Sequence, residues 1–171
     1  MATIKVHPEI HLLLCLLDQA YDKKAWHGPN LRGSIRGLSA SEAAWRPQPG
    51  RRSIAEIVLH AAYWKYIVRR RLRGDKRGSF AVRGSNWFPV AASLTEESWR
   101  GYVRLLEAEH QAMRAVIALL PRNLLQHTPP GSKVSNATLI SGIAAHDLYH
   151  AGQIQLLKRL QKAGIRRGIG Q

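Results

Sequence analysis

The sequence predicts an all-α protein with the architecture of a four-helix bundle. Four long segments carry apolar residues at the three- and four-residue spacing of an amphipathic helix, and capping residues precede them. No segment of strand length alternates apolar with polar residues, and the sequence contains no internal repeat. Because amphipathic helices in one chain bury their apolar stripes best against one another, this pattern favours a bundle.

The first predicted helix begins at His7-Pro8-Glu9, where proline takes the first helical position and an acidic residue lies in the first turn. Its inward-facing residues are Ile10, Leu13, Leu14, Leu17 and Tyr21. Glycine and proline in Trp26-His27-Gly28-Pro29 are expected to end it. Residues 29–52 are rich in Gly, Pro, Ser and Arg and hold one short predicted helix, with Ser39 as its cap and Glu42 three residues later.

The second predicted helix opens with a capping box at Ser53-Ile54-Ala55-Glu56. Its inward stripe is apolar except for His60, which is followed one turn later by Trp64. Its end, residues 69–73, is strongly basic, and cations stabilise the C-terminal end of a helix. The sequence therefore predicts a helix from about Ser53 to residue 73 with one histidine directed at the core.

A long connection, residues 74–89, joins this helix to the third one. Connections of this length in a small domain usually carry function or cross from one side of the fold to the other. A capping box at Ser93-Leu94-Thr95-Glu96 opens the third predicted helix, and Pro121 ends it. The inward face of this helix also contains a histidine, His110.

The fourth predicted helix is capped by Ser135 or Asn136 and continues to about Lys162. We expect the basic, glycine-rich tail from about residue 163 to 171 to be loose. The length of 171 residues suits one domain with a substantial core, so the chain is predicted to form a single domain over residues 1–171.

The composition restricts the classes of protein to which the chain can belong. Its single cysteine, Cys15, lies in an apolar helical run and is expected to be a small core residue, so neither a disulfide framework nor a cysteine-rich zinc site is predicted. The apolar run Leu12–Leu17 is too short for a membrane span and lacks the layout of a signal peptide. We therefore expect a soluble, cytoplasmic protein.

The chain is strongly basic, with 26 Lys and Arg against 11 Asp and Glu and a formal net charge of +15. Such a charge attracts anions of every kind, including nucleic acid, acidic lipid and small anionic ligands. A basic surface that serves only solubility explains the same numbers. The charge by itself therefore selects no function.

The fourth helix contains the motif that the rest of the interpretation depends on, His146-Asp147-Leu148-Tyr149-His150. Residues four apart on a helix share one face, so His146 and His150 can converge on one metal ion. Both lie on the apolar stripe, as His60 does on the second helix, and bundles build metal sites from inward side chains on facing helices. Three imidazoles with one open position are typical of a catalytic zinc-like site, and zinc, nickel, iron and manganese all accept imidazole.

Each of these histidines has a simpler alternative, a hydrogen-bonded residue of the core. We expect His110 to be such a residue or to support a ligand from behind. Glu56 lies one turn before His60, and its role in the capping box explains it, although it could also support a ligand. The aromatic residues expected either in the core or in a wall around the open metal position are Tyr63, Trp64, Tyr149, Trp26, Trp45 and Trp87.

Three segments together resemble the DinB/YfiT-like family, a group of bacterial four-helix-bundle proteins regarded as metalloproteins. They are residues 26–29, residues 53–64 and residues 146–154, and the resemblance extends from about Leu12 to Leu160. It implies an up-down-down-up bundle, which fits the long connection after the second helix. It also implies a metal site of three histidines, which correspond to His60, His146 and His150.

The resemblance implies chemistry as well. Better understood members of the family are thiol-dependent transferases and isomerases that use mycothiol, bacillithiol or glutathione, and others are regarded as metal-dependent hydrolases. Our first hypothesis is therefore an enzyme in which a divalent metal activates a low-molecular-weight thiol for transfer or detoxification of a small substrate. A second hypothesis is hydrolysis by metal-bound hydroxide. The absence of a glutamate directly after His146 disfavours a mechanism of the HExxH protease type.

Two further hypotheses involve no catalysis. A basic binding protein for nucleic acid or another polyanion is suggested by the clusters at residues 69–77 and 158–167, but aromatic residues are not interleaved with them and no DNA-binding motif is present. The other is a structural bundle whose histidines are core residues and which forms a homodimer. A homodimer is expected in the enzymatic hypotheses too.

Overall fold

The computed structural model describes residues 7–76 and 78–168, with side chains described as far as Gly164. Regular structure in these residues is helical, apart from an isolated bridge between Ser85 and Trp87, so the predicted all-α class is confirmed. The long helices are α1 (Pro8–Tyr21), α4 (Ile54–Leu72), α5 (Glu96–Ala118) and α6 (Asn136–Gly168). The short ones are α2 (Leu31–Ser34), α3 (Ala40–Ala44) and the 3-10 turn η1 (Arg122–Leu124).

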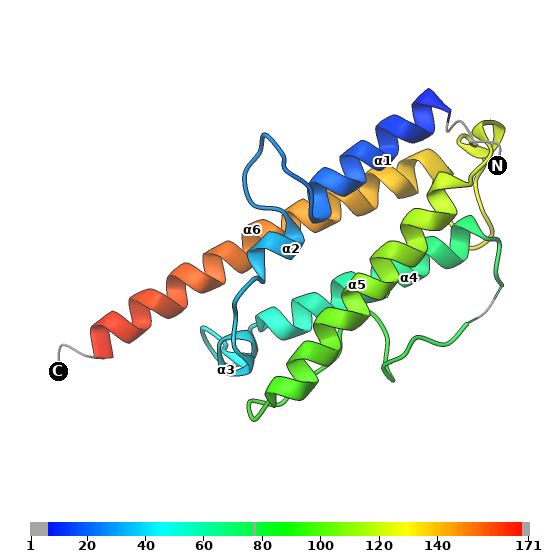
Figure 1. Ribbon diagram of the computed structural model, residues 1–171. Helices are drawn as coiled ribbons and strands as arrows, with labels where there is room; N and C mark the ends of the chain where they lie inside the picture. The colour runs from blue at the N-terminus through cyan, green and yellow to red at the C-terminus, as the bar shows by residue number, and fades with distance from the viewer. Residues whose placement is uncertain (1–6, 77, 169–171) are drawn as a thin grey trace.

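Each long helix packs against two others. Helix α6 lies against α1 and α4, and α5 lies against α4 and α1. Figure 1 shows that α1 and α6 lie side by side and run in one direction, whereas α4 and α5 run in the opposite direction. Because α4 and α5 begin at the same end of the molecule, residues 73–95 must return along its length, which accounts for the long connection (Figure 1).

Helix α1 ends earlier than the sequence predicted. It begins as expected, with His7 as cap and Pro8 in the first turn, but its last residue is Tyr21 instead of one near Trp26. The amides of Asp22 and Lys23 both donate to the carbonyl of Asp18, at 3.0 and 2.8 Å, which closes the helix. The side-chain amide of Asn30 then donates to the carbonyl of Lys23 at 2.9 Å. Asn30 also caps α2, a helix that the sequence did not reveal.

The predicted capping boxes of α3 and α4 are confirmed, but that of α5 is wrong. Ser53 and Glu56 cap α4 reciprocally, as predicted. Helix α5 begins at Glu96 with Thr95 as its cap, and Thr95 accepts from the amide of Ser98 at 3.2 Å. The carboxylate of Glu96 instead accepts from the amide of Ala40 at 2.7 Å, at the start of α3. Glu96, which the sequence pattern assigned to a local capping box, therefore forms a tertiary contact with α3 instead.

Helix α6 starts where the sequence predicted and ends later. Ser135 accepts from the amide of Thr138 at 3.3 Å, while Asn136 is buried and donates to the carbonyl of Leu124 at 2.9 Å. The helix continues through Gly164 to Gly168 instead of ending near Lys162. A single glycine costs about 1 kcal/mol in a helix and does not by itself end one. The last three residues of the expected loose tail, 169–171, lie outside the described residues.

The buried apolar residues form two clusters, and a layer of polar residues lies between them along the helices. On α4 the clusters meet between Ala62 and Val68, on α5 between Leu106 and Met113, and on α6 between Ala144 and Ile154. The residues buried in these intervals include Lys65, His110, Asp147 and His150. Burying polar groups without partners is costly, so the layer needs internal hydrogen bonds, ion pairs or a ligand.

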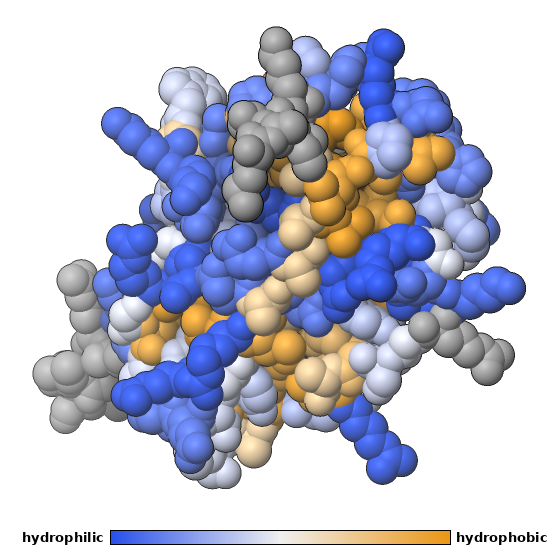
Figure 2. Space-filling model, turned by 45° about the vertical axis from the view of Figure 1, so that its right-hand side comes forward, coloured by the Kyte–Doolittle hydropathy of each residue, from blue (hydrophilic) through white to orange (hydrophobic). Residues whose placement is uncertain are grey.

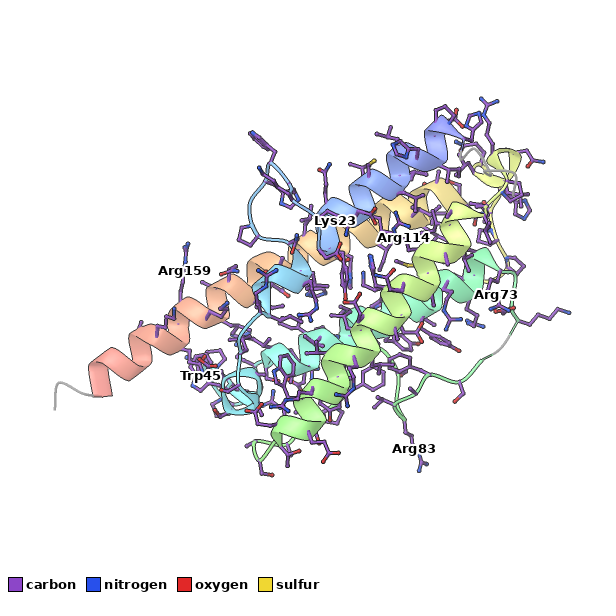
Figure 3. The ribbon with its side chains drawn as sticks, viewed as in Figure 1. Lys23, Trp45, Arg73, Arg83, Arg114 and Arg159 are labelled. Atoms are coloured by element: carbon purple, nitrogen blue, oxygen red, sulfur yellow. The ribbon has the colours of Figure 1, made fainter. Side chains whose placement is uncertain are left out.

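Much of the face shown in Figure 2 is hydrophilic, and basic side chains project from the molecule (Figure 3). On the face shown in Figure 2, hydrophilic residues surround separate areas of apolar surface. Arg159 projects from α6 away from the other helices, and Arg83 points outward from the connection between α4 and α5 (Figure 3). None of the described helices has a stretch long and apolar enough to cross a bilayer.

Candidate metal centre

Helices α4 and α6 bring three histidine side chains together, and we call His60, His146 and His150 the histidine triad. The Nε2 atom of His146 lies 3.1 Å from Nε2 of His60 and 3.1 Å from Nε2 of His150. Their potential ligand atoms all lie within 4.8 Å of one another. His60 and His150 are buried and His146 is half-buried. The helical spacing of four and the packing of α4 on α6 together produce this convergence.

Hydrogen bonds at the Nδ1 atoms of His60 and His150, which point away from the triad, fix the orientation of these two rings. Nδ1 of His60 lies 2.7 Å from the main-chain oxygen of Asn86, and Nδ1 of His150 lies 2.7 Å from Oε1 of Gln153. A carbonyl oxygen only accepts hydrogen bonds, so both Nδ1 atoms donate. A neutral imidazole carries one N–H, which leaves a lone pair on Nε2 of each ring. These lone pairs are directed toward the other ring nitrogens of the triad.

Hydrogen bonds within the triad cannot satisfy all three inner nitrogens. Nε2 of His146 can donate its single proton to one neighbour, and the other neighbour then keeps an unused lone pair in a buried place. A divalent ion accepts all three lone pairs at once. Two nitrogens that lie 2.0–2.1 Å from a tetrahedral ion are about 3.3 Å apart, close to the two separations of 3.1 Å found here. The geometry therefore fits a three-histidine metal site.

The surroundings keep the triad uncharged. The pKa of His146 is lowered to about 3, mainly by burial and in addition by the neighbouring His150 and His60. Burial also lowers the pKa of His150, to about 4, in spite of its hydrogen bond to Gln153. The pKa of His60 is lowered by burial, while its bond to Asn86 acts in the opposite direction. Metals bind the neutral form of imidazole, so these shifts keep the ligands ready at neutral pH.

The long connection between α4 and α5 covers one side of the triad. The indole of Trp87 stacks on His60 with ring centroids 3.9 Å apart and planes 10° apart, and the guanidinium of Arg52 lies 4.7 Å above that indole. Asn86 has a positive φ of 59°, a left-handed conformation that asparagine tolerates better than most residues. Its backbone oxygen contacts His60, and its side-chain oxygen accepts from the indole N–H of Trp64 at 2.9 Å.

The aromatic candidates from the sequence divide into those that contact the triad and those that do not. Trp64 contacts His60 and His146 edge-on, at centroid distances of 6.3 and 6.4 Å. Tyr149 is exposed, and its ring lies 5.1 Å from that of His150. Trp26 is 100 % exposed in the loop after α1, so it forms no wall around the triad. The earlier end of α1 removed it from the position that the sequence suggested.

Two other candidates, Glu56 and His110, contact no histidine of the triad. Glu56 is buried and accepts from the amide of Ser53 and from Arg46, and its other oxygen lies 3.5 Å from Arg52. Through Arg52, which lies over Trp87, it contributes only indirectly to the cover of the triad. His110 instead stacks on Tyr21 of α1, with centroids 3.6 Å apart and planes 12° apart.

His110 belongs to a second buried polar group, which we call the lysine cluster and to which each long helix contributes. Its members are the buried residues Tyr21, Lys65, His110 and Asp147 and the half-buried Glu107. The ammonium of Lys65 forms a fully buried ion pair with Asp147 and lies 5.0 Å from the ring centroid of Tyr21. The hydroxyl of Tyr21 donates to Glu107 at 2.9 Å. Burial lowers the pKa of Lys65 and raises that of Asp147, and their mutual attraction opposes both shifts.

Sequence reasoning missed three residues of these sites, Asn86, Lys65 and Gln153. Gln153 lies three positions after His150 on one helix, so its role could have been read from the i, i+3 spacing. Asn86 acts from a loop whose path the sequence does not reveal. Trp87 lies in the same loop and was one of the aromatic candidates, and it does contact the triad. Lys65 is a residue type that is almost never fully buried unless paired. Its partner is 82 positions away along the chain.

A helical protein with a buried, preorganised group of three histidines is a candidate metalloprotein, and the comparison with known families agrees. The family model described as the DinB superfamily matches residues 25–154. The chain belongs to the DinB superfamily, as the motifs in its sequence indicated. No curated protein and no solved structure matches it.

Proposed function

We propose that the protein binds one divalent metal ion through Nε2 of His60, His146 and His150. The observation that carries this proposal is the hydrogen bonding of the outer nitrogens: His60 and His150 donate from Nδ1 to oxygen atoms 2.7 Å away, so their Nε2 lone pairs converge on His146. Metal-ligating histidines commonly donate their other N–H to a carbonyl or carboxylate in this way. Membership of the DinB superfamily supports the same interpretation.

We propose further that the protein is an enzyme that uses this site to activate a low-molecular-weight thiol for transfer or detoxification. A bound divalent ion would supply Lewis acidity, which lowers the pKa of a thiol placed at the open position. Three neutral imidazoles do not compensate the charge of the ion, and Arg52 adds a positive charge beside His60. Such surroundings favour an anionic ligand. Trp87 and Trp64 limit access of water to the same histidines.

We also interpret the four long helices as an up-down-down-up bundle. The pairing of α1 with α6 and of α4 with α5, and their opposite directions in Figure 1, support this topology. The long return connection between α4 and α5 has a function in this interpretation, because it delivers Asn86 and Trp87 to the triad. The homodimer remains a prediction, which light scattering after size-exclusion chromatography tests.

The first experiment is metal analysis of protein purified without a nickel column. Mass spectrometry of the wild type should give close to one zinc, nickel, iron or manganese ion per chain. His60→Ala and His150→Ala should lose it, whereas His110→Ala, which lacks a buried histidine outside the triad, should keep it. Absence of metal in the wild type, with no uptake on titration with these four ions, would contradict the proposal and leave three core histidines.

The second experiment separates thiol chemistry from hydrolysis. The metal-loaded protein is incubated with a thiol and an electrophile such as monobromobimane or chlorodinitrobenzene, and in parallel with generic esters without thiol. We expect consumption of the thiol above the uncatalysed rate, and loss of that activity in His150→Ala. Turnover of esters without any thiol would instead favour a hydrolase, and no perturbation of the metal by any thiol would contradict thiol activation.

A further inference from the structure

A hollow of about 250 Å³ lies between α4 and α6, directly beside the histidine triad. Trp64 and Val68 line it from α4, and Leu139 and Ile143 line it from α6. His146 also lines it, and His146 is the triad member that is half-buried where the other two are buried. We call this space the apolar hollow.

The chemistry of the apolar hollow differs from that of the surroundings of Trp87. Its lining contains no charged side chain, and apart from His146 and the indole N–H of Trp64 its polar side-chain atom is the hydroxyl of Thr138. That indole N–H is already bound to Asn86. Elsewhere beside the triad, Trp87 stacks on His60, and the guanidinium of Arg52 lies over the indole of Trp87. The surroundings of Trp87 therefore favour an anion, whereas the apolar hollow favours an uncharged group.

We propose that the apolar hollow binds the neutral, hydrophobic group of the electrophile that reacts at the triad. This inference rests on the proposed function, and it names the substrate class: small molecules that carry one aromatic ring or a short branched alkyl chain next to the reactive atom. An apolar cavity of about 150 Å³ holds a benzene molecule, so 250 Å³ accommodates one ring with a small substituent. Typical pockets for larger ligands measure about 300–1,000 Å³.

Gly142 makes the inference testable. It lines the hollow one turn before His146, and a Cβ atom added to it would meet no atom within 4 Å. A larger side chain at this position would therefore occupy the hollow without displacing neighbouring atoms. It would also have a higher helix propensity than glycine. Gly152 is a matched control, because it lies on the same helix, is also exposed and has equally open surroundings, but lines a different hollow.

The experiment compares acetohydroxamate with benzohydroxamate on cobalt-loaded protein, whose visible spectrum reports coordination of either compound. Both carry the same metal-binding group, and only the second adds a ring. Burial of the ring should make benzohydroxamate bind about tenfold or more tightly than acetohydroxamate. This preference should disappear in Gly142→Leu and persist in Gly152→Leu. In parallel, binding of toluene to each protein as purified is followed by saturation-transfer NMR, which needs no metal.

The outcomes separate the hollow from the metal. Equal binding of the two hydroxamates, or an unchanged preference in Gly142→Leu, would overturn the inference and leave the metal centre intact. If the protein takes up no cobalt, the proposed metal centre fails, and toluene then decides: binding lost only in Gly142→Leu supports an apolar site, and no binding overturns it. A change of oligomeric state in Gly142→Leu with unchanged affinities would assign the hollow to a second copy of the chain and overturn the inference.

Discussion

The histidine triad and the lysine cluster are both buried polar groups, and they lie next to each other on α4 and α6. Asp147 follows His146 directly, yet it turns toward Lys65 while His146 turns toward His60. In the lysine cluster, a cation and an anion neutralise each other inside the protein. In the triad, lone pairs of uncharged rings point at one another. Burial alone therefore does not identify a ligand site, whereas the direction of the lone pairs does.

The largest effect is expected from breaking the lysine cluster. Asp147→Ala leaves the ammonium of Lys65 buried without its counter-charge, and such a loss typically costs about 3–5 kcal/mol of unfolding free energy. Urea unfolding of metal-free protein measures it. The double variant Lys65→Met, Asp147→Leu removes both charges, and we expect it to recover most of the stability. A cost below about 1 kcal/mol for Asp147→Ala would contradict the importance of this pair.

The next effect distinguishes the two groups by their response to metal. A ligand that binds only the folded protein stabilises it by about 2.7 kcal/mol when its free concentration is one hundred times its dissociation constant. We expect this gain in the wild type and in the Lys65→Met, Asp147→Leu variant, and none in His150→Ala. Urea unfolding with and without the metal gives the three values. An equal gain in His150→Ala would place the stabilising metal outside the triad.

The third effect is a loss of stability in acid, to which His110 contributes. Burial lowers the pKa of His110 to about 2 from its ordinary 6.5, and the positive charges of Lys65 and Arg114 act in the same direction. Below pH 6.5 the unfolded chain therefore binds a proton at His110 that the folded protein does not. The contribution of His110 to the unfolding free energy is thus fully present above pH 6.5 and is lost as the pH falls toward 2. At pH 5, His110 accounts for a loss of about 2 kcal/mol of unfolding free energy.

His110→Phe tests this contribution, because phenylalanine can stack on Tyr21 but cannot take up a proton. Between pH 8 and pH 5, metal-free His110→Phe should lose about 2 kcal/mol less stability than the wild type. The slope that remains should come from the triad, where the pKa values of His146 and His150 are lowered to about 3 and 4. Parallel pH profiles for the two proteins would show that His110 does not contribute.

The comparison also explains how far the sequence could predict the fold. Signals that act within one turn of helix were reliable: the capping box at Ser53 and Glu56 set the start of α4, and the apolar stripes gave the long helices. Signals that depend on tertiary contacts were not. Glu96 was expected to cap its own helix, but it accepts a hydrogen bond from the amide of Ala40. Helix α1 ends early, and the side chain of Asn30 donates to the carbonyl of Lys23 just after that end.

The same distinction applies to the site. His60, His146 and His150 could be selected because each interrupts an apolar stripe, a pattern visible in the sequence, and the structure brings their side chains together. Lys65 could not be selected from the sequence, because a lysine is buried only when it is paired, and its partner Asp147 is distant along the chain. Trp26 was expected either in the core or in a wall around the metal position, but its side chain is fully exposed. A sequence pattern therefore predicts which face a residue occupies better than which partner it meets.

The smallest effect concerns the support of the triad. Gln153→Ala removes the acceptor that holds Nδ1 of His150 at 2.7 Å, so the ring loses its fixed orientation. Losses of this kind weaken metal binding about tenfold or more, which corresponds to about 1.4 kcal/mol. Competition with a chromophoric chelator measures the dissociation constant. Gln153→Glu should restore the affinity, because a carboxylate accepts the same N–H. Gln155→Ala is the matched control, since Gln155 lies on the same helix and contacts Ser34, at 3.5 Å. Equal weakening in both variants would mean that the helix, and not the orientation of His150, had been perturbed.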